Sequence, residues 1–244
     1  MTTRTKIGIG VLVVLLAVGG IITASWLRDR SNTQEATRAA GADASVYKPG
    51  EESTWASTPG APPSKARSKT APKATSAKKV PNGCMNTLTE IVPTTFSIDA
   101  MKVKSPMLSL GEDESGAAAA PPKDASHTVG WWKNGPRVGS AKGHAVLTIH
   151  TYRHGGALGN ELYDPKSGFK VGDLVKMTDA QGRTQCYTME KSLKLWVKDY
   201  DPESDLLYND KGAPRAVIVI CWDFNGRTEN WDSRILYYLK PVAA

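Results

Sequence analysis

Hydrophobic and polar positions divide the chain into three parts, and the first is an apolar run. Residues 7–27 (IGIGVLVVLLAVGGIITASWL) carry no charge, and about 20 such residues cross the hydrocarbon core of a bilayer as a helix. Arg4 and Lys6 precede the run, which favours a cytoplasmic N-terminus. Ala24 and Ser25 leave a cleaved signal peptide open as an alternative. We predict a cytoplasmic tip and a transmembrane anchor in residues 1–30, a single-pass location in the cell membrane, and an extracytoplasmic remainder.

The second part, residues 31–81, is polar and has no regular hydrophobic period. It is rich in Ala, Pro, Ser and Lys, with few large apolar side chains. Such a composition buries too little surface to offset the entropy lost on ordering. We predict a disordered stalk that separates the anchor from a folded domain.

The third part, residues 82–244, has the pattern of short β-strands. Apolar or alternating runs recur between clusters of Gly, Asp, Asn and Pro, without a long amphipathic helix between them. The runs are residues 94–98, 145–149, 173–177, 186–189, 216–220 and 235–239. This pattern predicts an all-β domain, a single closed barrel of about eight strands with short helices or turns.

The positive charge lies outside the predicted domain. Residues 1–80 hold 12 of the 31 Lys and Arg and 5 of the 24 Asp and Glu, which accounts for the whole net charge of +7. A nucleic-acid-binding domain carries its basic surface on the folded module. We therefore expect no nucleic-acid partner.

Three residues near the ends of predicted strands are candidates for chemistry. Cys221 ends the run that starts at Arg215, a polar and aromatic stretch follows it, and Arg234 comes next; His150 ends an earlier run. A thiol, an imidazole and a guanidinium can act as nucleophile, proton donor and acceptor, and oxyanion stabiliser. Structural roles are also open: a core thiol, a surface arginine paired with a nearby carboxylate, and a hydrogen-bonded histidine. Other histidines compete with His150, namely His127, His144 and His154.

The chain has three cysteines, Cys84, Cys186 and Cys221. Outside the cytoplasm an odd number implies an intermolecular bridge or one free thiol. We take Cys221 as the free one, which leaves a Cys84–Cys186 disulfide as an open alternative.

These motifs together resemble the sortase family of cysteine transpeptidases. Residues 221–238 (CWDFNGRTENWDSRILYY) resemble the sortase segment that runs from the catalytic cysteine to the catalytic arginine, and residues 143–150 (GHAVLTIH) resemble the run that ends in the catalytic histidine. Residues 91–93 and 129–132 resemble the opening strands of the actinobacterial class E and F enzymes. Two positions depart from the family pattern, because Ile220 replaces the usual Thr and Ile149 the common Gly.

The resemblance implies a function for each candidate residue. Cys221 would be the nucleophile, His150 the proton donor and acceptor, and Arg234 the group that stabilises the oxyanion and substrate. Sortases cleave LPXTG- or LAXTG-like sorting signals between Thr and Gly through a thioester. The implied partners are secreted proteins with C-terminal sorting signals, the amine of a cell-wall precursor or a pilin, and the membrane.

Other readings stay open at this point. No cofactor or metal is expected, because no zinc-ligand spacing is present; an acidic run, Asp199, Asp201, Glu203 and Asp205, has oxygen ligands of the kind calcium prefers but also fits a solvated turn. The alternative function is a non-catalytic, membrane-anchored extracellular β-barrel that binds a partner and uses Cys221 as a buried structural residue.

Overall fold

The computed structural model describes residues 44–46 and 80–243. The predicted anchor lies outside these residues, and so does the predicted stalk except for its residues 44–46, 80 and 81. Within the described ranges, no helix has the length and apolar composition needed to span a membrane.

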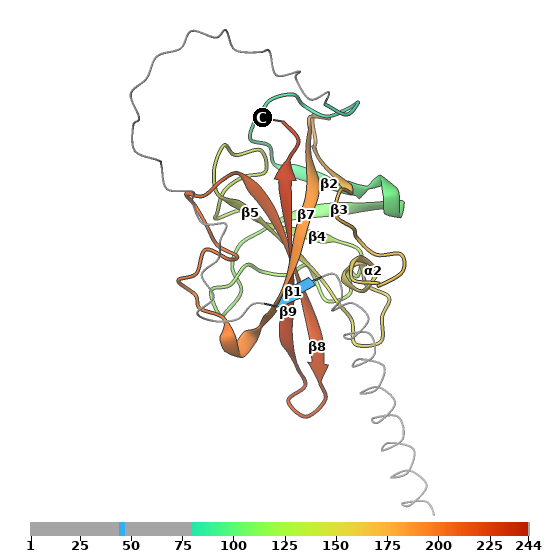
Figure 1. Ribbon diagram of the computed structural model, residues 1–244, viewed down its shortest axis with the longest axis vertical. Coiled ribbons are helices and arrows are strands. Elements are labelled where there is room, and N and C mark those ends of the chain that lie inside the picture. The colour runs from blue at the N-terminus through green and yellow to red at the C-terminus, as the bar shows by residue number, and fades with distance from the viewer. Residues whose placement is uncertain (1–43, 47–79, 244) are drawn as a thin grey trace, which may run out of the picture.

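The described part is a β-barrel (Figure 1). Its strands lie in one sheet in the order β1-β7-β6-β2-β3-β4-β5-β8-β9, and β7 also pairs with β9. This pairing closes a ring of eight strands and leaves β1 outside it, so the predicted closed barrel of about eight strands is confirmed. The strands are β1 (Ala44–Val46), β2 (Pro93–Ile98), β3 (Val103–Leu110), β4 (Val129–Trp132), β5 (His144–Ile149), β6 (Leu174–Asp179), β7 (Thr184–Trp196), β8 (Arg215–Asn225) and β9 (Asn230–Pro241).

Helices in the described part are short. The 3-10 helices η1 (Asp99–Met101) and η2 (Val197–Asp199) follow β2 and β7, and the five-residue helix α2 (Leu158–Leu162) follows β5. The strand β1 falls within the predicted stalk, where it pairs in parallel with residues 192–194 of β7.

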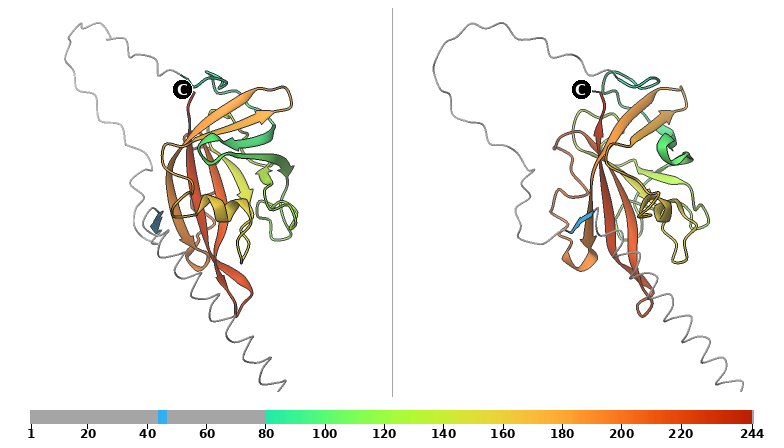
Figure 2. Two further views of the ribbon diagram at one scale, coloured as in Figure 1. Left: turned by 90° about the vertical axis from the view of Figure 1, so that its right-hand side faces the viewer. Right: turned by 45° about the vertical axis from the view of Figure 1, so that its right-hand side comes forward.

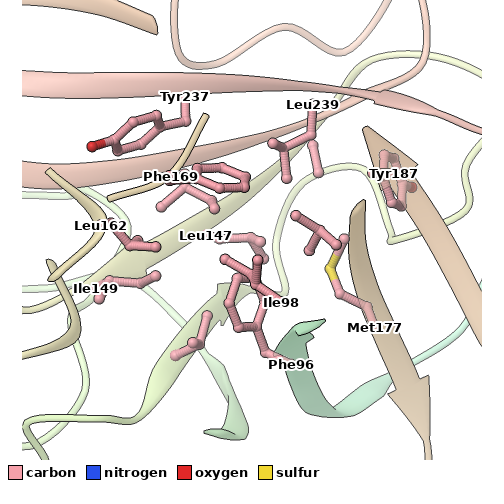
Figure 3. Close-up of a cluster of buried hydrophobic side chains, with 14 of the residues drawn as sticks. Phe96, Ile98, Leu147, Ile149, Leu162, Phe169, Met177, Tyr187, Tyr237 and Leu239 are labelled. Atoms are coloured by element: carbon pink, nitrogen blue, oxygen red, sulfur yellow. The ribbon is translucent and has the colours of Figure 1, made fainter. Parts of the chain in front are cut away.

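The interior of the barrel holds the main hydrophobic core (Figure 3). Along β8 and β9, alternate side chains enter this core, because successive residues of a strand point to opposite faces. The members from these two strands are Ala216, Ile218, Ile220, Trp222, Ile235, Tyr237 and Leu239. The other face of the same strands carries a second, smaller core, described below with the site.

The strands β8 and β9 extend beyond the apolar runs that predicted them. They form a hairpin that continues to Asn225 and Asn230 and projects past the rest of the barrel (Figures 1 and 2). The prediction that Cys221 ends its strand is therefore wrong. In the projecting part Phe224 and Trp231 form a half-buried aromatic pair, with ring centroids 5.3 Å apart, and the other side chains are polar although the backbone is paired as a strand.

A disulfide fixes the start of the domain to β7. Cys84 and Cys186 are bonded, with their Cα atoms 5.6 Å apart, and Cys221 is a free cysteine. Beside the bridge, the Met85 N–H donates to the Thr184 carbonyl at 2.9 Å. The Gln185 side chain adds hydrogen bonds of 3.0 Å to the carbonyls of Thr87 and Thr89.

Candidate active site

The strands β5, β8 and β9 lie side by side and align their side chains in rows. β5 pairs with β8 in parallel, and β8 pairs with β9 in antiparallel. Residues directly opposite one another point to the same face of the sheet. Two successive rows on one face are Val146, Val217 and Tyr238, and then Thr148, Val219 and Leu236.

The next row holds the three candidate residues. Cys221 is the register partner of Arg234. His150 follows Ile149, whose partner is Ile220, so His150 falls beside Cys221 on the other side. Neighbouring strands lie about 4.8 Å apart. The register therefore places His150 and Arg234 on either side of Cys221.

This row lies on the outer face of the barrel wall. Ile220 belongs to the main core, and Cys221 points the opposite way, as Val217 and Val219 do. These two valines pack in the second core, which also contains Leu195, Leu206, Leu236 and Tyr238. Cys221 is half-buried, because it lies where this second core ends.

Two loops cover the outer face on either side of the row. Residues 197–214 supply Leu206 to the second core, and the Tyr238 hydroxyl donates to the Leu206 carbonyl at 2.8 Å. Residues 111–128 lie against β5, where the Thr148 hydroxyl donates to the Ala119 carbonyl at 2.8 Å. The two loops are joined, since the Ala118 N–H donates to the Tyr208 hydroxyl at 2.8 Å.

Opposing effects act on the Cys221 thiol. Burial raises its pKa, and the positive charge of Arg234 lowers it; burial is the larger effect, so the pKa lies above the ordinary value of a thiol. At neutral pH the resting residue is therefore a thiol rather than a thiolate. A reaction at this sulfur needs a neighbour that removes the proton.

His150 is held in one orientation by the loop 111–128. Its Nε2 lies 2.7 Å from the carbonyl oxygen of Pro121. Because a carbonyl only accepts hydrogen bonds, Nε2 carries a proton. The Nδ1 nitrogen is therefore the one that can take up and release a proton, because the hydrogen bond at Nε2 sets this tautomer.

Arg234 is half-buried and bound to main-chain carbonyls. Its Nη1 donates to the carbonyls of Trp231 at 3.2 Å and Ser233 at 2.9 Å. Asp232, one of the nearby carboxylates with which a surface arginine could pair, accepts from the Asn225 side chain instead, at 3.0 Å. A guanidinium has five N–H donors, so this arrangement leaves donors for an anionic oxygen near Cys221.

The competing histidines lie outside the row. His144 is 2% exposed and its Nδ1 lies 3.2 Å from the Leu207 carbonyl; burial lowers its pKa. His127 is exposed and binds Glu161 at 2.8 Å. His154 is exposed in the loop after β5. Of the four histidines, His150 alone continues the row that contains Cys221.

Within the described ranges, no group of three or more His, Cys, Asp and Glu side chains is arranged to hold a metal ion. In the acidic run that resembled a calcium site, Asp199 pairs with Lys198 at 3.0 Å. The Asp201 carboxylate accepts the Glu203 N–H at 2.9 Å.

Sequence reasoning missed two parts of the site. One is the Pro121 carbonyl that orients His150, and main-chain atoms give no signal in a sequence. The other is a cluster formed by Lys194, Asp223 and Ser233, which neighbours Cys221 and Arg234 along β8 and β9 but lies on the opposite face of these strands. Asp223 and Ser233 were inside the motif that resembled sortases, but Lys194 is on another strand and only the fold brings it there.

Comparisons with known proteins give limited information. No family model matches the chain, and no curated protein does. Among solved structures it is similar to Streptococcus agalactiae sortase C1 in complex with MTSET, at 16% identity over 62% of this chain and 70% of that one, with a TM-score of 0.42. Streptococcus pneumoniae sortase C is 15% identical over 62% of this chain and 69% of that one, with a TM-score of 0.43. A lid mutant of Corynebacterium diphtheriae sortase A is 20% identical over 64% of this chain and 73% of that one, with a TM-score of 0.43. TM-scores below 0.5 are too low to assign a function, so the proposal below depends on the site.

Proposed function

We propose that this chain is a sortase-type cysteine transpeptidase. The observation that carries the proposal is the row on the outer face of the barrel, with Cys221 between His150 and Arg234. Motifs far apart in the chain suggested these three residues, and the strand pairing that joins them was not part of that reasoning.

In the first half of the reaction, Cys221 attacks the carbonyl carbon of Thr in a sorting signal of the LPXTG or LAXTG type. The thiol proton passes to Nδ1 of His150, and Arg234 donates hydrogen bonds to the oxyanion of the tetrahedral intermediate. The C–N bond to Gly then breaks, His150 gives the proton to the leaving amine, and the acyl group stays on sulfur as a thioester.

In the second half, an amine of a cell-wall precursor or a pilin attacks the thioester carbon. The C–S bond breaks, and the proton lost by the amine returns through His150 to the sulfur. No oxidant, metal or cofactor takes part in this sequence. A thioester suits it, because the thioester keeps the acyl group reactive toward the second amine.

The anchor in residues 1–30 and the stalk in residues 31–81 belong to the proposal. They would hold residues 82–244 outside the membrane, where secreted proteins with sorting signals and wall amines are present. The subtype we propose is the actinobacterial class E or F, on the motifs in residues 91–93 and 129–132.

The test is mass spectrometry of the full chain in detergent with pooled LPXTG-like and LAXTG-like peptides, with and without hydroxylamine. We expect an acyl adduct on Cys221 that hydroxylamine releases as a hydroxamate. Cys221→Ala should form none, and Arg234→Ala should lower kcat/KM by about 10²–10³-fold, the usual cost of losing an oxyanion donor. His150→Ala should also lose transfer, while His127→Ala, outside the row, serves as the matched control.

The alternative, a binding module with a structural Cys221, predicts a different result. Its thiol would resist alkylation in the folded protein, and no peptide would form an adduct. That result would end the enzymatic proposal. A full rate of transfer in His150→Ala would refute the role assigned to His150.

A further inference from the structure

A charged cluster lies on the inner face of β7, β8 and β9, next to Cys221 and Arg234 along the chain but opposite the face that carries them. Lys194 of β7 is 4% exposed, and its Nζ lies 2.7 Å from Oδ2 of Asp223. The hydroxyl of Ser233, a fully buried residue, donates to the same carboxylate oxygen at 2.6 Å. Lys194 also lies over the Trp196 ring, 4.7 Å from its centroid. One carboxylate therefore joins the strands β7, β8 and β9.

The cluster is directly connected to Arg234. Ser233 precedes Arg234 in β9, and its carbonyl accepts the 2.9 Å hydrogen bond from the Arg234 guanidinium. Asp223 is two residues after Cys221 in β8. The Ser233 hydroxyl thus fixes the same residue whose carbonyl holds the guanidinium.

The backbone at Asp223 has an uncommon conformation. Its φ is 54°, in the left-handed region, which Asp and Asn adopt more often than other residues with a Cβ. The bonds from Lys194 and Ser233 hold the side chain in place there. They fix the local path of β8 immediately after Cys221.

Fold stability is a weak reason for such a cluster. Removing charges from water costs free energy, and an apolar set of similar volume is often as stable as a buried ion pair. The hairpin around it is otherwise exposed at its tip, where residues 226–230 are all accessible to solvent. A buried lysine at this place therefore calls for a role in the site.

We propose that Lys194, Asp223 and Ser233 form a positioning network that holds the Arg234 guanidinium against Cys221. The three are positioning residues, since they act through Arg234 and not on a substrate. The inference rests on the proposed function for its role in catalysis, but the placement of Arg234 near the thiol can be tested without any substrate. A displacement of about 1 Å at such a site can cost 100-fold in rate.

The first measurement is the rate at which iodoacetamide alkylates Cys221 as a function of pH, on the full chain in detergent. Asp223→Asn keeps the size of the side chain and its tolerance of the left-handed region, and it removes the charge. Because the charge of Arg234 lowers the thiol pKa, a displaced guanidinium should move the midpoint of the profile to higher pH. Arg234→Ala should move it the same way.

The double variant Asp223→Asn/Arg234→Ala separates positioning from a general effect. If the network acts through Arg234, the double variant has the midpoint of Arg234→Ala alone, because the two changes are not additive when they act through one group. The proposal would be overturned if the midpoint of the double variant lay beyond that of Arg234→Ala by as much as Asp223→Asn alone shifts it. The matched control is Asp99→Asn, which breaks the Lys176–Asp99 pair, at 2.5 Å, on the β2 and β6 side of the barrel; its midpoint should equal that of the wild type.

A second variant covers the case in which Asp223→Asn does not fold. Lys194→Met/Asp223→Asn removes both charges together and leaves no unpaired buried lysine, and Ser233→Ala removes only the hydroxyl bond. With a transfer assay in hand, each folded variant should lose about tenfold or more in kcat with little change in KM, since Arg234 acts on the oxyanion. A folded variant with an unchanged alkylation profile refutes the network. A wild type that transfers no peptide refutes the proposed function, and the alkylation profiles still decide the network.

Discussion

Loss of the Cys84–Cys186 disulfide should lower the free energy of unfolding by an amount that depends on the length of the loop it closes. The bridge closes a loop between residues 102 apart, and a loop of about 100 residues corresponds to about 4.7 kcal/mol of unfolded-state entropy. Hydrogen bonds near the bridge do not depend on it: the Met85 N–H donates to the Thr184 carbonyl, and the Gln185 side chain donates to the carbonyls of Thr87 and Thr89. We therefore expect Cys84→Ser/Cys186→Ser to remain folded and to lose about 2–4.7 kcal/mol, the upper value being the pure loop term.

The assay is urea unfolding of the full chain in detergent, followed by tryptophan fluorescence without reducing agent. The double variant should lower the urea midpoint, and reduced wild type should match it. Cys221→Ser serves as the control. Its midpoint should equal that of oxidised wild type without reducing agent and that of reduced wild type with it, because Cys221 is outside the bridge. A loss below about 1 kcal/mol would refute the reasoning, because removal of a native disulfide typically costs about 2–5 kcal/mol.

Two further variants test buried polar groups. The Tyr237 hydroxyl has no hydrogen-bond partner among the described residues, and burial raises its pKa well above the ordinary value. Tyr237→Phe should therefore stabilise the fold by about 1 kcal/mol or more in the same urea assay. A loss of stability would show that the hydroxyl is bonded. The second variant concerns His144, whose pKa burial lowers below 6.5. As pH falls through that value, the unfolded chain binds the proton and the folded chain does not. The free energy of unfolding therefore drops by up to about 1.4 kcal/mol per pH unit. His144→Gln should flatten this slope between about pH 7.5 and about pH 5.5, and an equal slope in both proteins would contradict the assignment.

The pattern of the chain predicted the closed barrel and most strand positions, but not the length of the last two strands. The run 216–220 is apolar because both of its faces are covered, one by the main core and one by the second core. Beyond it, Trp222 returns to the main core and residues 223–225 leave the barrel. Hydrophobicity stops where burial stops, whereas backbone pairing continues, so a reading based on apolar residues ends the strand too early.

The strand β7 shows a second reason why the length of a strand is underestimated. It spans Thr184–Trp196, but only residues 186–189 were predicted. A register shift lies between Met189 and Lys191, so the alternation of side chains restarts within the strand. Residues 184–188 pair with β6, and residues 187–196 pair with β9 across this shift. A sequence window that spans the shift contains no single period of two.

Motifs suggested the residues of the candidate site, but not the row that they form. His150, Cys221 and Arg234 lie in three separate parts of the chain, and their alignment depends on the parallel register of β5 with β8. No local pattern encodes the register between distant strands. The same holds for Lys194, which reads as a solvent-facing position of an alternating strand and is in fact buried.

The second core gives a physical reason for the face of the barrel on which we propose the chemistry of Cys221. On the inner face, the neighbours Ile220 and Trp222 are almost fully buried, and a thiol there would have no access to a substrate. On the outer face, the two covered rows place apolar side chains next to Cys221, and burial raises its pKa. In its own row, Arg234 is the register partner of Cys221, and its positive charge lowers that pKa. A thiol that is protonated at rest avoids unproductive reactions, and it becomes a nucleophile only when a substrate brings the proton transfer and the oxyanion together. The raised pKa and the positive partner are therefore two parts of one arrangement, and the boundary between the covered and open rows of β8 creates both.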